Sequence, residues 1–177
     1  MATAYSKIQR NFWETDEARE MTPEEKYFWM YLQTNANVNT LGCYAFRMRK
    51  AMDETGYNRE TLEKLLQRME QVLRILYDEG TKEVFLLHWA EGNWNKKTAT
   101  LRALAADLKE IQSKTLKETV KTLLLKNGIF TEEEVEKAEK TAPSAQERNE
   151  KEQRGTTGNK RSGEGEGEGE GEGEKIY

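Results

Sequence analysis

The sequence predicts a mainly helical α+β fold, in which several helices pack against a small β-sheet. Apolar residues recur at helical spacing in several segments, and two strand-like segments flank a turn at Gly80. Hydrophobic residues make up 36% of the 177 residues and charged residues 34%. A core of ordinary size is therefore expected only if part of the chain lies outside it.

The first predicted helix has the clearest start. Thr22 is a helix-capping residue, Pro23 follows at the first helical position, and Glu25 completes a capping box. We expect the helix to end near Asn35. Its inner stripe consists of Phe28, Tyr31 and Leu32, with Trp29 beside it.

Two further helices follow a short strand-like segment, "LGCYAF" at 41–46. The first is expected at 46–55 and is ended by Gly56. Asn58 is the expected cap of the second, which runs to Gln71. Its apolar residues recur at i, i+3, i+4 and i+7: Leu62, Leu65, Leu66 and Met69.

The next segment, "LRILYDEGTKEVFLLHWA", predicts a β-hairpin with Gly80 in its turn. The order is then helix, strand, helix, helix, strand, strand, which is the element order of a winged helix-turn-helix with the hairpin as the wing. The strand at 41–46 can complete a three-stranded sheet that covers the open side of the helices. We predict this winged-helix domain at residues 1–97.

Residues 98–141 are predicted to form a helical extension that serves oligomerisation or partner binding. Thr98 or Thr100 is the expected cap of a helix to Ile111, a second helix stops at Gly128, and a third begins with a capping box of Thr131 and Glu134. These helices are expected to pack on the winged helix or on another subunit.

The segment 142–177 is predicted to be a disordered acidic tail. Its repeat "GEGEGEGEGEGE" alternates the residue with the greatest backbone freedom and a repelling charge, and buries no apolar surface. The tail contains nine acidic and six basic residues. The rest of the chain is therefore nearly neutral, so net charge alone gives no support for nucleic-acid binding.

The cysteine content and the lengths of the apolar segments indicate the cellular compartment of the protein. Cys43 is the only cysteine, which excludes a disulfide within the chain and fits a reducing cytoplasm. The N-terminus lacks the apolar run of a secretory signal, and no stretch approaches the ~20 apolar residues of a membrane span. We therefore expect a cytoplasmic protein that does not bind membranes.

No motif predicts catalysis, a cofactor or a metal. A glycine-rich dinucleotide fingerprint, a P-loop and a nucleophile elbow are all missing from the sequence. His88 is the only histidine, and its place between Leu87 and Trp89 in a predicted strand favours a structural role. Cys43 is expected to be a small core residue. The acids Glu14, Asp16, Glu17 and Glu20 are read as a solvated face.

The helix predicted from Asn58 to Gln71 is neutral but polarised. It has three basic and three acidic residues. At 100° per residue, one edge of the helix carries side chains of types that form hydrogen bonds with base edges and phosphates: Thr61, Lys64, Gln67 and Arg68. This edge predicts DNA contact in a helix-turn-helix. The alternative is a solvated face with i,i+4 salt pairs such as Glu60–Lys64.

Other candidates for DNA contact flank that edge. They are Arg59 and Gln71 on the same helix, Arg47, Arg49 and Lys50 at the start of the preceding helix, and Lys82 at the wing tip. For Lys82 alone, ordinary surface charge is the favoured reading. Trp94 beside Lys96, Lys97 and Arg102 suggests either base stacking or core closure, and we prefer core closure.

Aromatic residues crowd the N-terminal part: Trp13, Tyr27, Phe28, Trp29 and Tyr31. A helix cannot hide residues 27, 28, 29 and 31 on one side. Some of these rings must therefore meet the N-terminal arm, the later helices or another subunit, which favours a homo-oligomer.

The segments "MTPEEKYFWMYLQTNANVNTLGCY", "ETGYNRETLEKLL" and "VFLLHWAEGNWN" resemble the N-terminal winged-helix domain of phage replisome organiser proteins, relatives of DnaD-like primosome proteins. The resemblance covers residues 6–97. It implies a protein of phage or prophage DNA replication that binds double-stranded DNA, forms oligomers and helps to load the replicative helicase, directly or through a helicase loader.

The chain departs from this family after Gly128, where it lacks the family's C-terminal domain with its tyrosine-isoleucine-tryptophan ending. Helicase loading that depends on that domain is therefore in doubt. Two other functions remain open: a transcriptional regulator, and an assembly module whose winged helix touches no DNA. Neighbouring genes for a helicase or its loader would favour replication.

Overall fold

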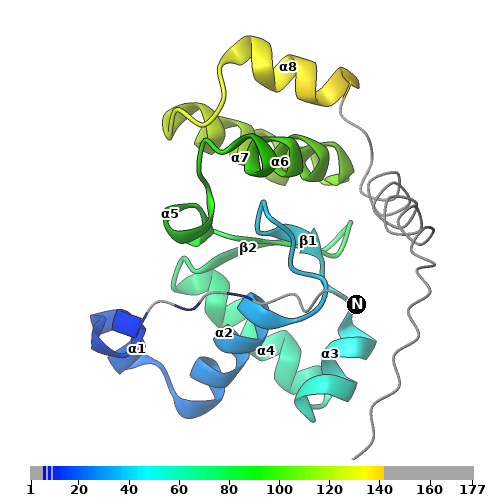
Figure 1. Ribbon diagram of the computed structural model, residues 1–177. Coiled ribbons are helices and arrows are strands. Elements are labelled where there is room, and N and C mark those ends of the chain that lie inside the picture. Colours follow the sequence, from blue (N-terminus) through cyan, green and yellow to red (C-terminus); the bar gives the residue numbers. More distant parts are fainter. Residues whose placement is uncertain (1–5, 7, 9, 142–177) are drawn as a thin grey trace, which may run out of the picture. The chain divides into compact units, whose positions relative to one another are not determined.

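The structure is a computed structural model that describes residues 6, 8 and 10–141 (Figure 1). The predicted tail at 142–177 lies outside the described residues. The fold is α+β as predicted: mostly helical, with one three-stranded antiparallel sheet in the described part.

The described elements follow in one order along the chain. A 3₁₀ helix, η1, and the short helix α1 precede the helix α2; then come β1, α3, α4, β2 and β3, and after them four helices. Their bounds are η1 Arg10–Glu14, α1 Asp16–Glu20, α2 Pro23–Thr34, β1 Cys43–Ala45, α3 Met48–Thr55, α4 Arg59–Gln71, β2 Ile75–Asp78, β3 Glu83–Leu86, α5 Trp89–Asn93, α6 Thr98–Glu110, α7 Lys114–Lys126 and α8 Glu132–Thr141.

Local capping signals explain most helix ends. The capping box of Thr22 and Glu25 is confirmed, and Asn58 caps α4 by accepting the Thr61 amide at 2.9 Å. Gly56 ends α3, as predicted, and it adopts the left-handed conformation. The second predicted box is also confirmed, because the Thr131 amide donates to the Glu134 carboxylate at 2.8 Å and the Glu134 amide to the Thr131 hydroxyl.

Three local predictions are wrong. The hairpin strand ends at Leu86, so His88 lies before α5 as an exposed residue and not within a strand. Helix α6 begins at Thr98 with Lys97 at the capping position and no capping side chain, so neither Thr98 nor Thr100 caps it. The helix predicted at 46–55 begins two residues later, because Phe46 is a buried residue whose amide donates to the Lys82 carbonyl.

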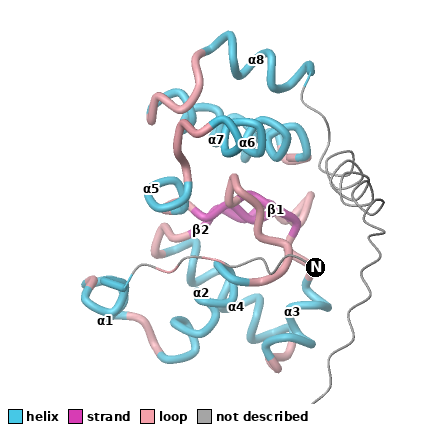
Figure 2. The backbone as a smooth tube through the Cα atoms, in the orientation of Figure 1, coloured by secondary structure: helices cyan, strands magenta, loops and turns pink. Residues whose placement is uncertain are grey.

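The sheet has β3 at its centre, in the order β1-β3-β2. Figure 2 shows the strands between the helices α2, α3 and α4 and the helices α6 and α7. Tyr44 of β1 and Tyr77 of β2 both pair with Val84 of β3. All four residues of β3 are buried, including Glu83, because β3 has a strand on each side and helices on both faces. Helices α2, α3 and α4 lie on one face, while α6 and α7 lie on the other (Figure 1).

Two carboxylates hold α6 and α7 against the sheet region through hydrogen bonds with backbone amides. Glu83 of β3 accepts the backbone amides of Gln112 and Ser113, the latter at 2.7 Å. Asp107 of α6 accepts the amide of Leu41 just before β1, at 3.3 Å. The helices after α5 therefore share one continuous core with the sheet.

Trp94 closes that core, as the preferred reading of its segment predicted. It is buried, and its indole N–H donates to the Leu41 carbonyl at 3.3 Å. Trp89 of α5 donates in the same way to the Thr40 carbonyl at 3.0 Å. Both indoles thus cover the loop that leads into β1.

Candidate nucleic-acid interface

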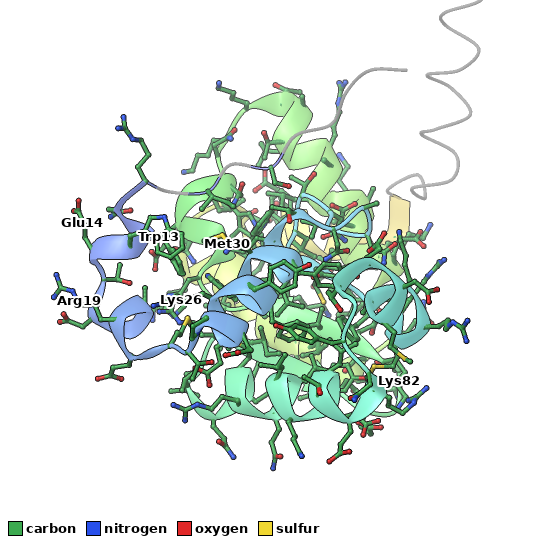
Figure 3. The ribbon with its side chains drawn as sticks, turned by 90° about the horizontal axis from the view of Figure 1, so that it is seen from below. Trp13, Glu14, Arg19, Lys26, Met30 and Lys82 are labelled. Carbon is green, nitrogen blue, oxygen red and sulfur yellow. The ribbon has the colours of Figure 1, made fainter. Side chains whose placement is uncertain are left out.

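Helix α4 presents a continuous polar face to solvent. Leu62, Leu65, Leu66 and Met69 are buried against the sheet and α2, which confirms the predicted apolar stripe. The side chains that point away are exposed: Arg59, Glu60, Glu63, Lys64, Gln67, Arg68 and Gln71. Arg68 turns back toward Glu25 of α2. Figure 3 shows α4 from the side, along the lower edge of the view, with Lys82 of the hairpin near one end of the helix.

Two cations of this face are bonded to acids one turn away. The ammonium of Lys64 lies 2.7 Å from the Glu60 carboxylate, and the guanidinium of Arg59 lies 3.5 Å from that of Glu63. The hydrogen bond from Lys64 lowers the pKa of Glu60. The i,i+4 salt pairs that the alternative interpretation expected are therefore present on this helix in the protein without DNA.

Arg68 has a role inside the protein. Its Nε donates to Oε1 of Glu25 at 2.9 Å, while the other oxygen of Glu25 accepts the Thr22 amide at 2.8 Å. Glu25 is buried, so the pair links α4 to the first turn of α2. Sequence reasoning missed this contact, because 43 residues separate the two side chains.

The cations of α3 and of the β2–β3 hairpin follow the same pattern. Arg49 lies 3.4 Å from Asp53 and Lys50 lies 3.7 Å from Glu54. Lys82 is paired with Glu79, whose hydrogen bond raises the pKa of Lys82. Arg47, at the start of α3, is exposed and has no ion pair with any acid in the described residues.

The fold brings some of the ten predicted contacts together and leaves others apart. Arg59, Gln67 and Lys82 line one depression of about 170 Å³ between α4 and the hairpin, together with Glu63 and Tyr77. Arg68 instead lines a separate hollow with Glu25. Thr61 is half-buried, and Gln71 is exposed at the far end of α4.

Burial raises the pKa of the Tyr77 hydroxyl at this depression. Its phenol remains a hydrogen-bond donor at neutral pH. The depression therefore offers cationic, amide and phenolic donors to an anion, next to the carboxylates of Glu63 and Glu79.

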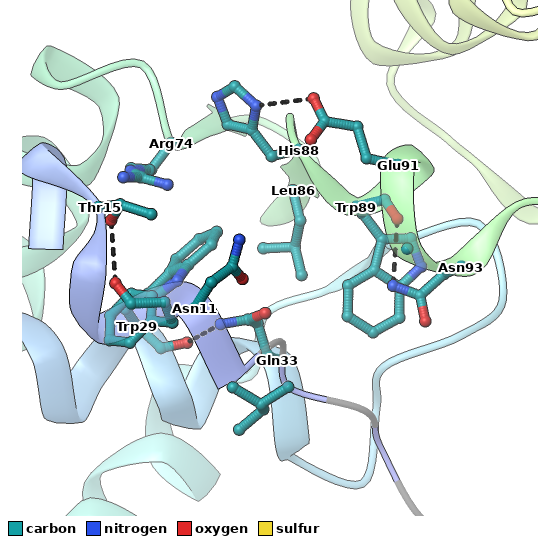
Figure 4. A pocket seen from close by; sticks show the side chains of 13 residues that line it. Asn11, Thr15, Trp29, Gln33, Arg74, Leu86, His88, Trp89, Glu91 and Asn93 are labelled. Carbon is teal, nitrogen blue, oxygen red and sulfur yellow. Dashed lines mark hydrogen bonds and ion pairs between the residues drawn. The ribbon is translucent and has the colours of Figure 1, made fainter.

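A larger cleft, of about 520 Å³, lies on another part of the molecule (Figure 4). Trp29 and Trp89 form parts of its wall, and the guanidinium of Arg74 lies 5.5 Å from the ring centre of Trp29. His88 at the rim lies 3.4 Å from Glu91. The sequence carries no local signal for this cleft, because its lining comes from η1, α2, β3, α5 and the segments beside them.

Two exposed aromatic rings mark a third surface. Trp13 is 62% exposed and Tyr27 is 48% exposed, and with Pro23, Lys26 and Met30 they line an apolar hollow of about 380 Å³. Figure 3 shows Trp13 near Lys26 and Met30. Of the other rings in the predicted aromatic cluster, Phe28 and Trp29 are buried. Tyr31 is half-buried, and its hydroxyl donates to the exposed Glu54 at 2.9 Å.

Cys43 is buried in β1, as expected for a small core residue. Within residues 10–141 the structure contains no group of three or more histidine, cysteine, aspartate or glutamate side chains that could hold a metal ion. No described helix is both long and apolar enough to cross a membrane.

Comparison with known proteins identifies no relative. No protein-family description matches the chain, and neither a curated protein nor a solved structure matches it.

Proposed function

We propose that this protein is a non-enzymatic winged-helix DNA-binding protein. The observation that carries the proposal is the position of the polar face of α4, which lies outward beside the β2–β3 hairpin. The element order and the sheet order β1-β3-β2 support the winged-helix assignment. The turn between α3 and α4, with Gly56 in the left-handed conformation, supports the helix-turn-helix.

In this mechanism α4 enters the major groove of double-stranded DNA. Lys64 and Gln67 contact base edges, while Arg59, Arg47 and Lys82 contact phosphates. The carboxylates that pair with these cations must be displaced or turned aside when phosphate arrives. The DNA affinity that α4 alone provides is therefore modest. Binding is favoured at a DNA site whose bases form contacts that compensate for the ion pairs lost within the protein.

We further propose that the DNA bound is that of a phage or prophage replication origin, and that a helicase or a helicase loader is the protein partner. This step depends on the resemblance to replisome organisers. Co-purification of the tagged protein with a helicase or loader encoded nearby tests it. Capture of RNA polymerase, or repression of an adjacent promoter without any helicase contact, would favour the transcriptional regulator.

The DNA mechanism is tested by fluorescence anisotropy with labelled duplex and single-stranded DNA over a salt series. Arg68→Ala is unsuitable as a test of contact, because Arg68 also holds Glu25. The informative variant is Lys64→Gln with Gln67→Ala, since both side chains are exposed.

The matched control is Lys140→Gln, because Lys140 forms the same kind of exposed i,i+4 pair with Glu136 in α8. We expect the α4 variant to bind duplex DNA at least about 10-fold more weakly, the equivalent of about 1.4 kcal/mol, and the control to bind as wild type. Equal binding by all three proteins would contradict the proposed role of α4.

A second candidate function is an assembly module that binds another protein copy. The exposed Trp13 and Tyr27 around an apolar hollow favour it, because aromatic side chains dominate binding energy at protein interfaces. Light scattering of Trp13→Ser beside Val72→Ser, an exposed apolar residue elsewhere, tests it. Loss of oligomers in the first variant only would support assembly through this surface, and two unchanged oligomer distributions would exclude it.

A further inference from the structure

The positive charge of the described chain is concentrated in α6, α7 and the loop before them, not in α4. Residues 96–126 contain eight lysines and arginines and three acids. One of the acids, Asp107, is buried and bonded to the Leu41 amide. Helix α4 contains three bases and three acids, so the two regions differ strongly in local charge.

Five of the six cations of the helix pair fall into two stripes. Lys114, Lys117 and Lys121 recur at i, i+3 and i+7 on α7, and Arg102 and Lys109 lie seven residues apart on α6, so each set shares one side of its helix. The ammonium of Lys117 lies 3.5 Å from the Lys109 carbonyl oxygen, which brings the stripes together near the turn between the helices. These five residues are named the basic face.

The acids near the basic face neutralise only part of it. Glu118 pairs with Lys121 at 2.9 Å. Arg102 and Lys114 are exposed and form no ion pair with any acid that the structure describes. The helix α8, which packs on α6, contains five glutamates and two lysines, so the excess of positive charge does not extend to α8.

We infer that the basic face binds the phosphate backbone of nucleic acid without reading its sequence. This inference rests on the proposed DNA-binding function and adds a second surface to it. Seven helical residues span about 10 Å, so Arg102 and Lys109 are far enough apart to contact different phosphates of one strand, which carries one phosphate per about 3.4 Å of DNA axis. Because the basic face is on α6 and α7, it lies on the opposite side of the sheet from α4 (Figure 1).

The chemistry of the face favours a polyanion over the alternatives. Leu125 is the large apolar side chain exposed on α7, at 37%, and one such residue gives little insertion into a lipid surface. No exposed aromatic ring lies among the described residues of α6 and α7, so base stacking contributes nothing there. Phosphate contact alone predicts binding that is strongly salt-dependent and tolerant of sequence.

The test compares two triple variants of the full chain by anisotropy with a 30-base-pair duplex and with single-stranded DNA. The basic-face variant is Arg102→Gln/Lys109→Gln/Lys114→Gln. The control, Arg10→Gln/Arg19→Gln/Lys26→Gln, removes the same charge from exposed or half-exposed positions on η1, α1 and α2. Circular dichroism and urea titration confirm that both variants fold.

We expect the basic-face variant to lower the slope of log K against log salt by roughly 2 to 3 and to weaken binding about 10-fold or more, equally for unrelated sequences. We expect the control variant to change neither the salt slope nor the affinity. If the basic-face variant binds as wild type while Lys64→Gln/Gln67→Ala loses binding, the inference is overturned and the proposed function stands. If wild type binds no DNA at low salt, including when it binds vesicles with 30% anionic lipid, both the inference and the proposed function fail.

Discussion

Arg68 of α4 donates from Nε to Oε1 of Glu25 in α2 at 2.9 Å, and Glu25 at the same time completes the capping box of its own helix. One buried carboxylate thus serves both a helix start and a contact between helices. Because Arg68 is only half-exposed and directed at Glu25, its first role is to hold α4 in position. The helix that we propose for DNA contact is therefore oriented by a charge pair.

Removal of this pair is expected to destabilise the protein. Arg68→Ala leaves a buried carboxylate with one partner fewer, and should lower the free energy of unfolding by about 1–3 kcal/mol. Urea titration measures this change in the free energy of unfolding. In a double-mutant cycle with Glu25→Gln the two losses should be clearly less than additive. Additive losses would show that the two side chains do not interact in solution.

Gly42 and Gly56 form a matched pair for a test of packing. Both residues have a left-handed backbone, with φ of 78° and 77°. A methyl group added at Gly42 would lie 2.4 Å from Cγ of Trp89, whereas a methyl group added at Gly56 would have no atom within 4 Å. Gly56→Ala should cost about 1 kcal/mol from backbone strain. Gly42→Ala should cost at least about 2 kcal/mol more, because α5 must move. Equal urea midpoints for the two variants would contradict the close packing of α5 on the loop before β1.

The attachment of α6 and α7 to the sheet is expected to depend on Glu83. Its carboxylate accepts two backbone amides at the turn between these helices. Glu83→Ala leaves buried amides without a partner and should cost about 2–4 kcal/mol. Hydrogen exchange should show lost protection at Gln112 and Ser113 before it is lost in α4. Unchanged protection at these amides would show that the turn is held by other contacts.

Stability should fall at low pH through Asp78. Hydrogen bonds from the Ser113 hydroxyl and from the amides of Thr81 and Gly80 lower the pKa of its carboxyl in the folded state. The unfolded value is about 3.9, so the contribution is present above that pH and disappears as the pH falls through the folded pKa. Asp78→Asn should flatten the pH dependence of unfolding below about pH 4. The control is Asp16→Asn, which removes an exposed carboxylate; the same flattening in both would contradict this assignment.

Cys43 is expected to resist thiol reagents in the folded protein. It is buried in β1, and burial raises its pKa, with further contributions from the carboxylates of Glu83 and Asp107. Native protein at pH 8 should therefore react with a disulfide reagent only as fast as it opens, and unfolded protein at once. Reaction of the native protein within seconds would contradict the packing around β1.

Local signals in the sequence predicted much of the fold. The capping residues Thr22, Asn58 and Thr131 mark helix starts, because each side chain bonds an amide three residues away. Apolar spacing gave the buried side of α4, and the hairpin follows from two strands around a turn. The strand prediction at His88 was wrong because the apolar run continues past Leu86, although the chain turns there into α5 and places Trp89 against Gly42.

The candidate interface was less predictable, because long-range contacts decide which cations are available. The i,i+4 pairing of Lys64 with Glu60 follows from the sequence, but the pairing of Arg68 with Glu25 does not. Sequence reasoning found only one residue of the basic face, Arg102, because the net charge of −4 over the whole chain hides the positive segment at 96–126. Its two stripes become neighbours only through the α6–α7 turn.

The most direct measurement is a ¹H–¹⁵N spectrum of the full chain titrated with a 30-base-pair duplex at low salt. We expect the largest shifts in the amides of α4 and of the hairpin turn at residues 79–82, with a second set in α6 and α7, and none in η1 or α1. Shifts confined to η1, α1 and the Trp13 hollow would contradict DNA binding by α4. No shifts at saturating DNA would contradict DNA binding altogether and leave the assembly module as the function that fits.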